Sequence, residues 1–595
     1  MSASTSSQPN FLIIIADDLG FSDVGCFGSE ISTPNLDRLA ARRGSVRLTN
    51  FHTASACSPT RSMLLSGTDN HLAGLGQMAE TIKREPVFFD EDGKQKPGYE
   101  GVLNRRVAAL PEILGDTHHT WLSGKWHLGL TAETTPHARG FHRSWSLLPG
   151  AGSHYNYAPP AASAPDGKPA LNFMPRLYVE DDRFLDPDKD LPENFYSSDV
   201  FVDQWLRFYE ETRDPKHEHA GRPWCSLLTL TAPHWPLQAD PEDVEPYKGK
   251  YDDGPLALRA RRLDGLHRAG LLPRAHIDAA RPVRFNFADR ELAQWDELSS
   301  SERAISSRTM ETYAAMVTRM DTAIGRVLDR LEEDGVLDNT FVLFAADNGA
   351  EGALLEAMPL SGGNIGDYIA NSFDNSLDNI GRPNSFVWYG PLWAQAATAP
   401  AAQYKAWITE GGIRCPAILH FPPLLAERSP FAPHPAADGS ADTSPSTYGK
   451  VSHALTTVMD ILPTILDLTK VAHPHPNRFQ GREILPMRGV SWVPHLRADT
   501  EEVHSADEAI GWELFGQQAI RRGKWKAVFI PKPSGPEKWQ LFNLEQDPGE
   551  SVDEAERQPD ILSRLVEDWT IYESEAGVIL PRPGTDDLKR GYGPR

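Results

Sequence analysis

A cysteine near the start of a predicted helix is the best-placed reactive residue in this sequence. Pro59 needs no N–H partner and predicts the helix start, and Gly67 predicts its end. Cys57 then lies at the positive end of the helix dipole, which favours a negative or strongly polarised group. Arg61, four residues on, shares its helix face and can reach back over the Cys57 side chain. The segment predicts an anion site around a reactive atom; the alternative is a cysteine with a depressed pKa and no catalytic role.

Oxygen-bearing side chains occur in two adjacent pairs that are far apart in the sequence. Asp17 and Asp18 directly follow one apolar run. Asp347 and Asn348 directly follow another. Carboxylates with one amide suit a hard cation, Ca²⁺ or Mg²⁺, rather than zinc, which prefers nitrogen and sulfur. Each pair alone is more typical of helix caps and turns than of a metal site, but their occurrence together with Cys57 favours a cation site.

Lysine and histidine side chains form a second group of candidates. Lys125 and His127 follow an apolar run and alternate on a segment that we expect to be extended, so both should point the same way. His234 follows a further apolar run, and Lys405 stands in the segment Tyr-Lys-Ala-Trp. Taken singly, a lysine is most often a solvated surface residue and a histidine a structural one.

Short apolar runs bounded by turn residues precede most of these candidates and predict strands that are buried on both faces. The runs are 11–16, 120–124, 225–233 and 341–346. Amphipathic stretches at 33–41 and 309–333 predict helices among them. This alternation predicts an α/β domain with a largely parallel sheet, in which ligands bind beyond the carboxyl ends of the strands. Four strand ends should therefore meet in one active site.

The length of 595 residues exceeds a single hydrophobic core, so we expect two domains. A catalytic domain is predicted over residues 1–485 and an α+β domain over 486–595. Segment 429–449, rich in Pro, Ala, Ser and Asp, is predicted to be a surface insertion. The other predicted elements are a strand at 415–421, a helix at 456–468, antiparallel strands within 512–530 and 539–550, and a closing helix at 560–575.

The formal net charge of −23 argues against a protein that binds nucleic acid or an anionic membrane. Attraction for an anionic substrate must then come from a local pocket. No apolar run is long enough to span a membrane or to serve as a signal peptide. Four cysteines do not make a disulfide scaffold and suit a reducing compartment. We therefore expect a cytoplasmic protein.

Several sequence motifs resemble the signatures of one enzyme family. The pattern C-x-P-x-R from Cys57, followed by an apolar stretch and Ser-Gly, resembles the first signature of the type I sulfatases, and GKWHLG at 124–129 resembles the second. The segment from Lys405 to EGGIR at 410–414 is similar as well. The likeness is to bacterial arylsulfatases of the Pseudomonas type and covers most of the chain. It implies an alkaline-phosphatase-like α/β fold: a large mixed, mostly parallel sheet between helices, plus a smaller C-terminal α+β domain with an antiparallel sheet.

The resemblance also implies the cofactors. In that family the cysteine, here Cys57, is oxidised to Cα-formylglycine, and the hydrate of this aldehyde is the nucleophile. A formylglycine-generating enzyme, acting on the unfolded chain, is the implied partner. A single Ca²⁺, with Mg²⁺ the less expected ion, is implied to bind position 57 and four further side chains. These are Asp17, Asp18, Asp347 and Asn348.

The remaining candidates take their roles from the same resemblance. One hydroxyl of the hydrate is expected to attack sulfur while His234, with Lys405, protonates or stabilises the departing oxygen. Lys125 and Lys405 hold the sulfate oxygens, as preorganised donors in a water-poor site would. Arg61 steadies the hydrate, and His127 helps to deprotonate the second hydroxyl, which expels sulfate.

Substrate identity is left open by the sequence. A small-molecule sulfate monoester is expected, an aryl sulfate before an alkyl sulfate, with phosphate or phosphonate esters as the nearest alternative. A non-enzymatic metal- and anion-binding protein is the alternative of a different class. Six aromatic residues could line an apolar pocket or simply pack in the core: Trp145, Tyr155, Tyr157, Trp388, Tyr389 and Trp393.

Overall fold

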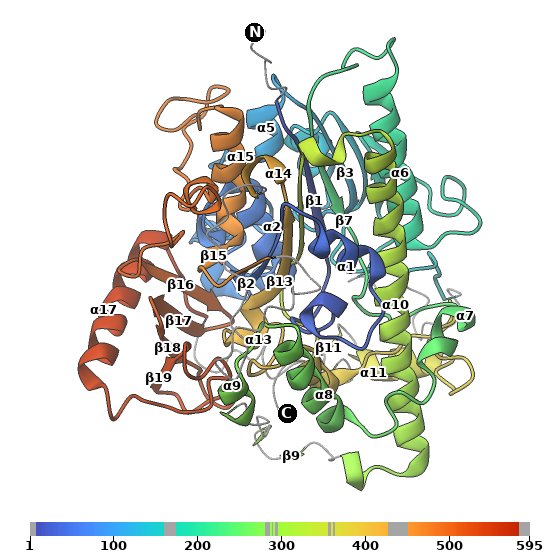
Figure 1. Ribbon diagram of the computed structural model, residues 1–595, viewed down its shortest axis with the longest axis vertical. Helices are drawn as coiled ribbons and strands as arrows, with labels where there is room; N and C mark the ends of the chain where they lie inside the picture. The colour runs from blue at the N-terminus through green and yellow to red at the C-terminus, as the bar shows by residue number, and fades with distance from the viewer. Residues whose placement is uncertain are drawn as a thin grey trace.

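The centre of the molecule is a mixed sheet of eleven strands (Figure 1). The structure, a computed structural model, describes residues 8–159, 174–279, 286–287, 290–291, 295–354, 359–360, 363–425 and 450–581. The sheet has the order β14-β2-β13-β10-β1-β7-β3-β4-β5-β6, with β15 also paired to β2. Its strands are β1 (Asn10–Ala16), β2 (Ser45–His52), β3 (His119–Lys125), β4 (Arg143–Leu147), β5 (Tyr178–Glu180), β6 (Arg183–Leu185), β7 (Trp224–Thr229), β10 (Thr340–Ala346), β13 (Arg414–His420), β14 (Lys450–Ser452) and β15 (Thr456–Thr457).

The middle of this sheet is parallel. Strands β10, β1, β7, β3 and β4 run in the same direction, whereas β13 is antiparallel to both β10 and β2. Every residue of β1 and β10 is buried, because helices cover both faces, and this explains why their sequences are continuously apolar. The prediction of a large mixed, mostly parallel sheet is confirmed.

Helices lie on both sides of the sheet. Figure 1 shows the sheet running between one group formed by α2, α5 and α15 and another formed by α6 and α10. The helices are α1 (Pro34–Ala41), α2 (Cys57–Ser66), α3 (Asn70–Ala73), α4 (Ala79–Ile82), α5 (Leu110–Leu114), α6 (Ser197–Arg213), α7 (Pro241–Val244), α8 (Pro255–Arg268), α9 (Arg274–Ala279), α10 (Ser300–Glu333), α11 (Ile365–Ser372), α12 (Gly390–Ala397), α13 (Glu410–Ile413), α14 (Pro422–Leu425), α15 (Ile461–Thr469), α16 (Val493–Leu496) and α17 (Pro559–Ala576).

Two predicted helices differ at their amino ends. The helix predicted from residue 309 begins nine residues earlier, because Ser299 and Glu302 form a reciprocal capping box. The helix predicted at 456–468 is helical only from Ile461, since Thr456 and Thr457 pair with β2 as a short strand. The predicted insertion at 429–449 lies outside the described residues.

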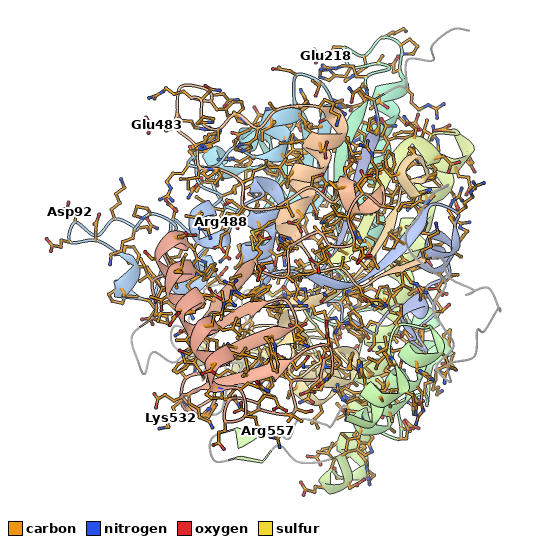
Figure 2. All side chains as sticks on the ribbon, turned by 60° about the vertical axis from the view of Figure 1, so that its left-hand side comes forward. Asp92, Glu218, Glu483, Arg488, Lys532 and Arg557 are labelled. Atoms are coloured by element: carbon orange, nitrogen blue, oxygen red, sulfur yellow. The ribbon has the colours of Figure 1, made fainter. Side chains whose placement is uncertain are left out.

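The C-terminal part forms an antiparallel sheet in the order β16-β17-β18-β19, with α17 packed across it. Its strands are β16 (Ala509–Leu514), β17 (Gln517–Arg522), β18 (Trp525–Phe529) and β19 (Trp539–Asn543). Figure 2 brings this unit forward, with Lys532 and Arg557 labelled at its lower edge. The predicted antiparallel C-terminal sheet is confirmed, while a domain boundary at residue 485 stays a prediction.

Short elements complete the described structure. Two further two-stranded sheets pair β8 (Asn286–Phe287) with β9 (Arg290–Glu291), and β11 (Pro359–Leu360) with β12 (Gly363–Asn364). No helix in the described ranges is both long and apolar enough to cross a bilayer.

Candidate active site

The ends of β1 and β10 bring the four oxygen-bearing side chains together. Ala16 lies opposite Ala346 in the parallel pair, so the residues that follow the two strands start from the same edge of the sheet. Asp347 N donates to Ala16 O at 3.1 Å, and Asp18 N donates to Asp347 Oδ1 at 3.3 Å. Asn348 Nδ2 donates to Asp18 Oδ1 at 2.6 Å. The four side chains, all buried, are Asp17, Asp18, Asp347 and Asn348.

Two oxygens of this cluster lack the partners that buried acceptors need. Asp17 Oδ1 and Asn348 Oδ1 are buried, and neither has a hydrogen-bond partner among the described residues. One ligand atom each from Asp17, Asp18 and Cys57 lies within 4.8 Å of the others. Buried acceptors without donors are costly unless a cation satisfies them. The residues therefore fit a hard cation bound through oxygen.

Burial and neighbouring charges shift the pKa values of Asp347 and Asp18 in opposite directions. Burial, reinforced by the nearby Asp17, raises the pKa of Asp347 to about 6 despite the opposing charge of Arg61. Burial is the largest single effect on Asp18 and disfavours its ionised form, but Lys405, His234 and Lys125 together outweigh burial and lower the pKa of Asp18 to about 2. A cation at this cluster would favour the ionised form of Asp347.

Cys57 begins α2, two residues before the predicted start at Pro59, with Ala56 as the N-cap. Gly67 ends the helix in the left-handed region, with φ of 64°, as predicted. The thiol is 1% exposed. Burial raises its pKa to about 12, although Lys125 and Lys405 act in the opposite direction. The depressed pKa that the alternative assumed for Cys57 is therefore contradicted, while the catalytic role of Cys57 stays a prediction.

Arg61 links the end of β10 to the end of β3 through hydrogen bonds. Its Nε and Nη2 donate to Asp347 Oδ2 at 3.0 and 2.9 Å, and its Nη1 donates to Lys125 O at 2.7 Å. The hydrogen bonds of the guanidinium thus go to Asp347 and the end of β3, and Cys57 is among the groups that act on its charge. Arg61 fixes the orientation of the Asp347 carboxylate.

Lys125 and His127 approach the site from the end of β3. Lys125 Nζ donates to Asp17 Oδ2 at 2.6 Å in a fully buried ion pair. His127 has φ of 56°, so the expected extended run breaks there and simple strand alternation does not set its direction. Its Nε2 lies 3.7 Å from Glu80 Oε1. Burial, with a smaller effect of Lys125, lowers the pKa of His127, which leaves a neutral imidazole.

His234 and Lys405 lie on the Asp18 side of the cluster. His234 Nδ1 donates to Trp235 O at 2.7 Å, and its Nε2 lies 3.4 Å from Asp18 Oδ2. Lys405 Nζ lies 2.9 Å from Asp18 Oδ1 and 3.0 Å from Asp18 Oδ2. Burial holds the pKa of His234 well below its usual range; the charge of Asp18 opposes this shift and that of Lys405 adds to it.

Sequence reasoning missed Glu351. Its Oε2 lies 2.9 Å from Lys405 Nζ, and burial raises its pKa. The available signal was its position four residues after Asp347, on the same predicted strand end. A second missed residue is His154, whose Nε2 donates to the backbone oxygen of His234 at 2.9 Å.

Aromatic residues divide between the core and the neighbourhood of His234. Trp145, Tyr389 and Trp393 belong to the main hydrophobic core, so for these three the packing alternative holds. Trp388 packs against a separate apolar cluster that includes Trp235. The ring of Trp235 lies 4.4 Å from that of His234. This second cluster provides an apolar surface beside the polar site.

The arrangement as a whole is a buried cage of opposite charges around one side chain. The cations of Arg61, Lys125 and Lys405 pair with four carboxylates beside the thiol of Cys57. The carboxylates are Asp17, Asp18, Asp347 and Glu351, and His127 and His234 lie next to these groups. Such a site can bind a cation at its oxygens and an anion at its lysines, and it can move protons through neutral imidazoles.

Comparisons with known proteins are consistent with this geometry. The family model described as Sulfatase matches residues 9–471. The chain is 49% identical to an uncharacterized sulfatase of Schizosaccharomyces pombe over 96% of this chain and 95% of that protein. It is 32% identical to an arylsulfatase of Klebsiella aerogenes over 82% of this chain and 92% of that one. A solved structure described as a complex with its substrate D-glucosamine-2-N,6-O-disulfate is similar in fold, with a TM-score of 0.57, 17% identity and coverage of 97% and 99%.

Proposed function

The chain belongs to the sulfatase family and is a sulfuric ester hydrolase. On this premise, we propose that it hydrolyses aryl sulfates at the buried site around Cys57. The observation that carries the proposal is the position of Cys57, which is buried beside Lys125, Lys405 and Asp17. In the same cluster, Asp17 Oδ1 and Asn348 Oδ1 have no hydrogen-bond partner among the described residues. Family membership excludes the non-enzymatic alternative.

We propose that Ca²⁺ occupies the oxygen cluster. Asp17, Asp18, Asp347 and Asn348 would hold it together with position 57, because the cluster offers only oxygen donors besides that position and leaves two of them unsatisfied. Mg²⁺ demands near-ideal octahedral geometry and keeps several waters, so it suits this dry cluster less well. When bound, the ion would supply positive charge that polarises the nucleophile and the sulfate oxygens.

Cys57 is proposed to be converted to formylglycine, which the family uses. A buried thiol whose pKa is about 12 stays protonated at neutral pH and is a poor nucleophile. The aldehyde would supply, as its hydrate, two hydroxyl groups on one carbon. Because Cys57 is 1% exposed in the folded protein, the formylglycine-generating enzyme would have to act on the unfolded chain. A cytoplasmic location is part of the proposal, since all four cysteines are unpaired and buried.

The cations of the cage are proposed to bind the sulfate group. Lys125 and Lys405 would donate to its oxygens, releasing their present bonds to Asp17 and Asp18 as the metal takes over those carboxylates. Arg61 would keep Asp347 oriented through its two donors. Because these groups are fixed by the fold before substrate arrives, they lower the cost of reorganisation.

Two histidines are proposed to move protons. His234, with Lys405, would protonate the departing oxygen. Burial keeps His234 neutral without substrate, but the negative charge of a bound sulfate ester would offset the lysine charges and favour the protonated form. His127, neutral and without a hydrogen-bond partner at either ring nitrogen within the described ranges, would accept the proton of the second hydroxyl.

The decisive experiment measures modification and turnover in one sample. The mass of the peptide from Ala56 to Arg61 should show loss of the thiol in proportion to the arylsulfatase activity. Fully active protein with an intact Cys57 thiol would overturn the proposal.

A comparison of kcat/KM for matched aryl and alkyl sulfates, an aryl phosphate and an aryl phosphonate monoester would test the substrate class. The apolar cluster around Trp235, beside His234, supports the aryl sulfate. A higher kcat/KM for an alkyl sulfate or a phosphorus ester would reassign the substrate.

A further inference from the structure

Four imidazole rings gather at the amino end of β3, opposite the end that carries Lys125. The ring centroids of His119 and His219 are 4.5 Å apart, those of His142 and His219 are 4.7 Å apart, and those of His119 and His142 are 5.3 Å apart. His217 lies 5.6 Å from His219. Since β3 rises about 3.3 Å per residue, His119 and Lys125 lie roughly 20 Å apart, so this cluster is separate from the catalytic cage.

His119 has buried polar atoms that nothing in the described chain satisfies. The residue is 0% exposed, and neither of its ring nitrogens has a hydrogen-bond partner among the described residues. One ligand nitrogen from each of His119, His142 and His219 lies within 4.8 Å of the others. A buried imidazole with both nitrogens unpartnered and two more imidazoles beside it calls for a bound ligand.

A surface pocket of about 400 Å³ opens onto these rings. It is lined by His119, His142, His217 and His219, together with His137 and Glu218. Glu218, labelled at the top of Figure 2, stands at the edge of the molecule, and its Oε1 lies 3.8 Å from His219 Nε2. The pocket gives an ion a path from solvent to the buried His119.

The rings are held in the neutral form that binds metals. Burial, followed by the neighbouring histidines, lowers the pKa of His119 to about 3. Burial also lowers the pKa values of His142 and His219. Neutral imidazoles keep a lone pair for a metal ion at neutral pH.

We propose that His119, His142 and His219 form a binding site for a divalent transition-metal ion, with Zn²⁺ as the ion expected. Three nitrogen ligands suit Zn²⁺ and its first-row neighbours, whereas the hard Ca²⁺ prefers oxygen. Water from the pocket, or His217, can take the fourth position. The site lies far from the reacting atoms, so its role is structural. The bound ion would link the turn at 217–219 to the start of β3 and stabilise both.

Ligation through Nε2 requires the present proton positions at His142 and His219 to change. Thr120 N donates to His142 Nδ1 at 3.0 Å, and Thr120 Oγ1 lies 2.9 Å from the same atom. If the ion takes Nε2 of His142, the proton of that ring moves to Nδ1, where Thr120 Oγ1 accepts it and the Thr120 N–H loses its partner. Arg222 Nη1 lies 3.1 Å from His219 Nδ1. If the ion takes Nε2 of His219, the proton of that ring moves to Nδ1, and Arg222 Nη1 loses this acceptor.

The test is equilibrium dialysis of the full-length, Ca²⁺-loaded protein against Zn²⁺ in the presence of a competing chelator, with metal content measured per chain. The Cys57→Ala variant is used throughout, so that the catalytic thiol cannot contribute a ligand. We expect one Zn²⁺ per chain, bound at least ~10-fold more weakly after His219→Gln or His142→Gln. His137→Gln, which changes a histidine of the same pocket outside the triad, is the matched control and should bind normally.

Substitution of Co²⁺ for Zn²⁺ provides an independent readout, because a tetrahedral Co²⁺ site gives visible absorption that depends on nitrogen ligands. Loss of that absorption in His219→Gln, with retention in His137→Gln, supports the triad. Absence of Zn²⁺ retention by the parent protein, or equal binding by His219→Gln and the parent, overturns the proposal. Arylsulfatase turnover of His219→Gln with Cys57 intact should equal that of the unsubstituted enzyme, which separates this site from the catalytic one.

Discussion

At the scale of single residues, the environment of Cys57 decides what chemistry is available to it. A thiol at a helix start is usually activated, but here burial outweighs Lys125 and Lys405 and raises its pKa to about 12. The reactive form must then come from covalent conversion rather than from ionisation.

Replacing Cys57 with serine tests this conclusion. A sulfated serine has no second hydroxyl on the same carbon and cannot expel sulfate, so kcat for an aryl sulfate should fall by more than about 10³-fold. Intact-protein mass after mixing with substrate should reveal the sulfated adduct. Cys225→Ala, which alters another buried thiol away from the site, should keep normal turnover. Undiminished turnover by a homogeneous Cys57→Ser preparation would contradict the mechanism.

The unsatisfied oxygens of Asp17 and Asn348 predict a response to Ca²⁺. Adding Ca²⁺ to metal-free protein should raise the free energy of unfolding by about 2.7 kcal/mol at a free concentration of 100 times Kd. Since the ion needs Asp347 ionised, and the pKa of Asp347 without metal is about 6, the affinity should rise as pH increases through 6. Thermal unfolding at pH 5 and pH 7.5, with and without Ca²⁺, measures both effects.

The control for this response changes one exposed carboxylate instead. Asp92 lies on a surface turn (Figure 2). The Asp92→Asn variant should keep the full increase in unfolding free energy on adding Ca²⁺, whereas Asn348→Ala should lose most of it. An equal shift in both variants would place the ion elsewhere.

At the scale of elements, the C-terminal sheet holds the loop that carries Lys405. Gln517, the first residue of β17, donates through Nε2 to Ala406 O at 2.7 Å and accepts from Ile408 N at 3.3 Å. Ala406 adopts φ of 69°, and its N donates to Ser55 O at 2.7 Å, next to the helix of Cys57. One buried amide from the smaller sheet therefore positions the loop of Lys405, the lysine that we propose to be catalytic.

Gln517→Ala should loosen this loop without removing any group that touches substrate. The lost bonds should cost about 1–2 kcal/mol of stability, and kcat/KM for an aryl sulfate should fall by about 10-fold at temperatures well below unfolding. Gln518→Ala, on the next residue of the same strand, is the control. Loss of stability with unchanged kcat/KM would show that Gln517 is structural only.

At the scale of the whole molecule, buried charges join the two sheets. Lys526 Nζ in β18 lies 2.9 Å from both Glu410 Oε1 and Glu550 Oε1, and His52 Nε2 lies 2.9 Å from Glu410 Oε2. Burial, opposed by Lys526 and reinforced by Glu410, raises the pKa of Glu550 to about 7. The raised pKa predicts that the stability of the contact between the sheets varies with pH.

A raised carboxyl pKa means that the folded state holds a proton that the unfolded state releases. The stability associated with protonated Glu550 is full below pH 4.5 and is lost as pH rises to about 7. Glu550→Gln, which mimics the protonated form, should therefore be more stable than the parent above pH 7. The difference should be on the order of 3 kcal/mol, at about 1.4 kcal/mol per tenfold change in proton affinity.

Denaturant unfolding of the Glu550→Gln variant and the parent from pH 4 to pH 8.5 measures the difference. The two stabilities should converge below pH 4.5. A constant difference across this range would mean that the pKa of Glu550 is the same in the folded and unfolded states. Glu545→Gln, at an exposed position nearby, should show no such divergence.

The sequence alone predicted that the candidate residues of the site meet at one edge of the sheet, and the structure brings them together there. Asp17 and Asp347 directly follow strands, Lys125 ends a strand, and His234 lies in the loop after another. Because parallel strands of one sheet end at the same edge, their convergence could be predicted from order along the chain. The helix boundary at Gly67 and the antiparallel C-terminal sheet were equally readable from local patterns.

Only the tertiary structure decided how these groups are charged and held. The pKa of Cys57 depends on burial. Lys405 is shared between Asp18 and Glu351, and its loop is held by Gln517 from another sheet. The histidine cluster joins residues that lie up to 100 positions apart. Solvent exclusion and contacts between distant segments exist only once the chain has packed, so no local pattern of residues could reveal them.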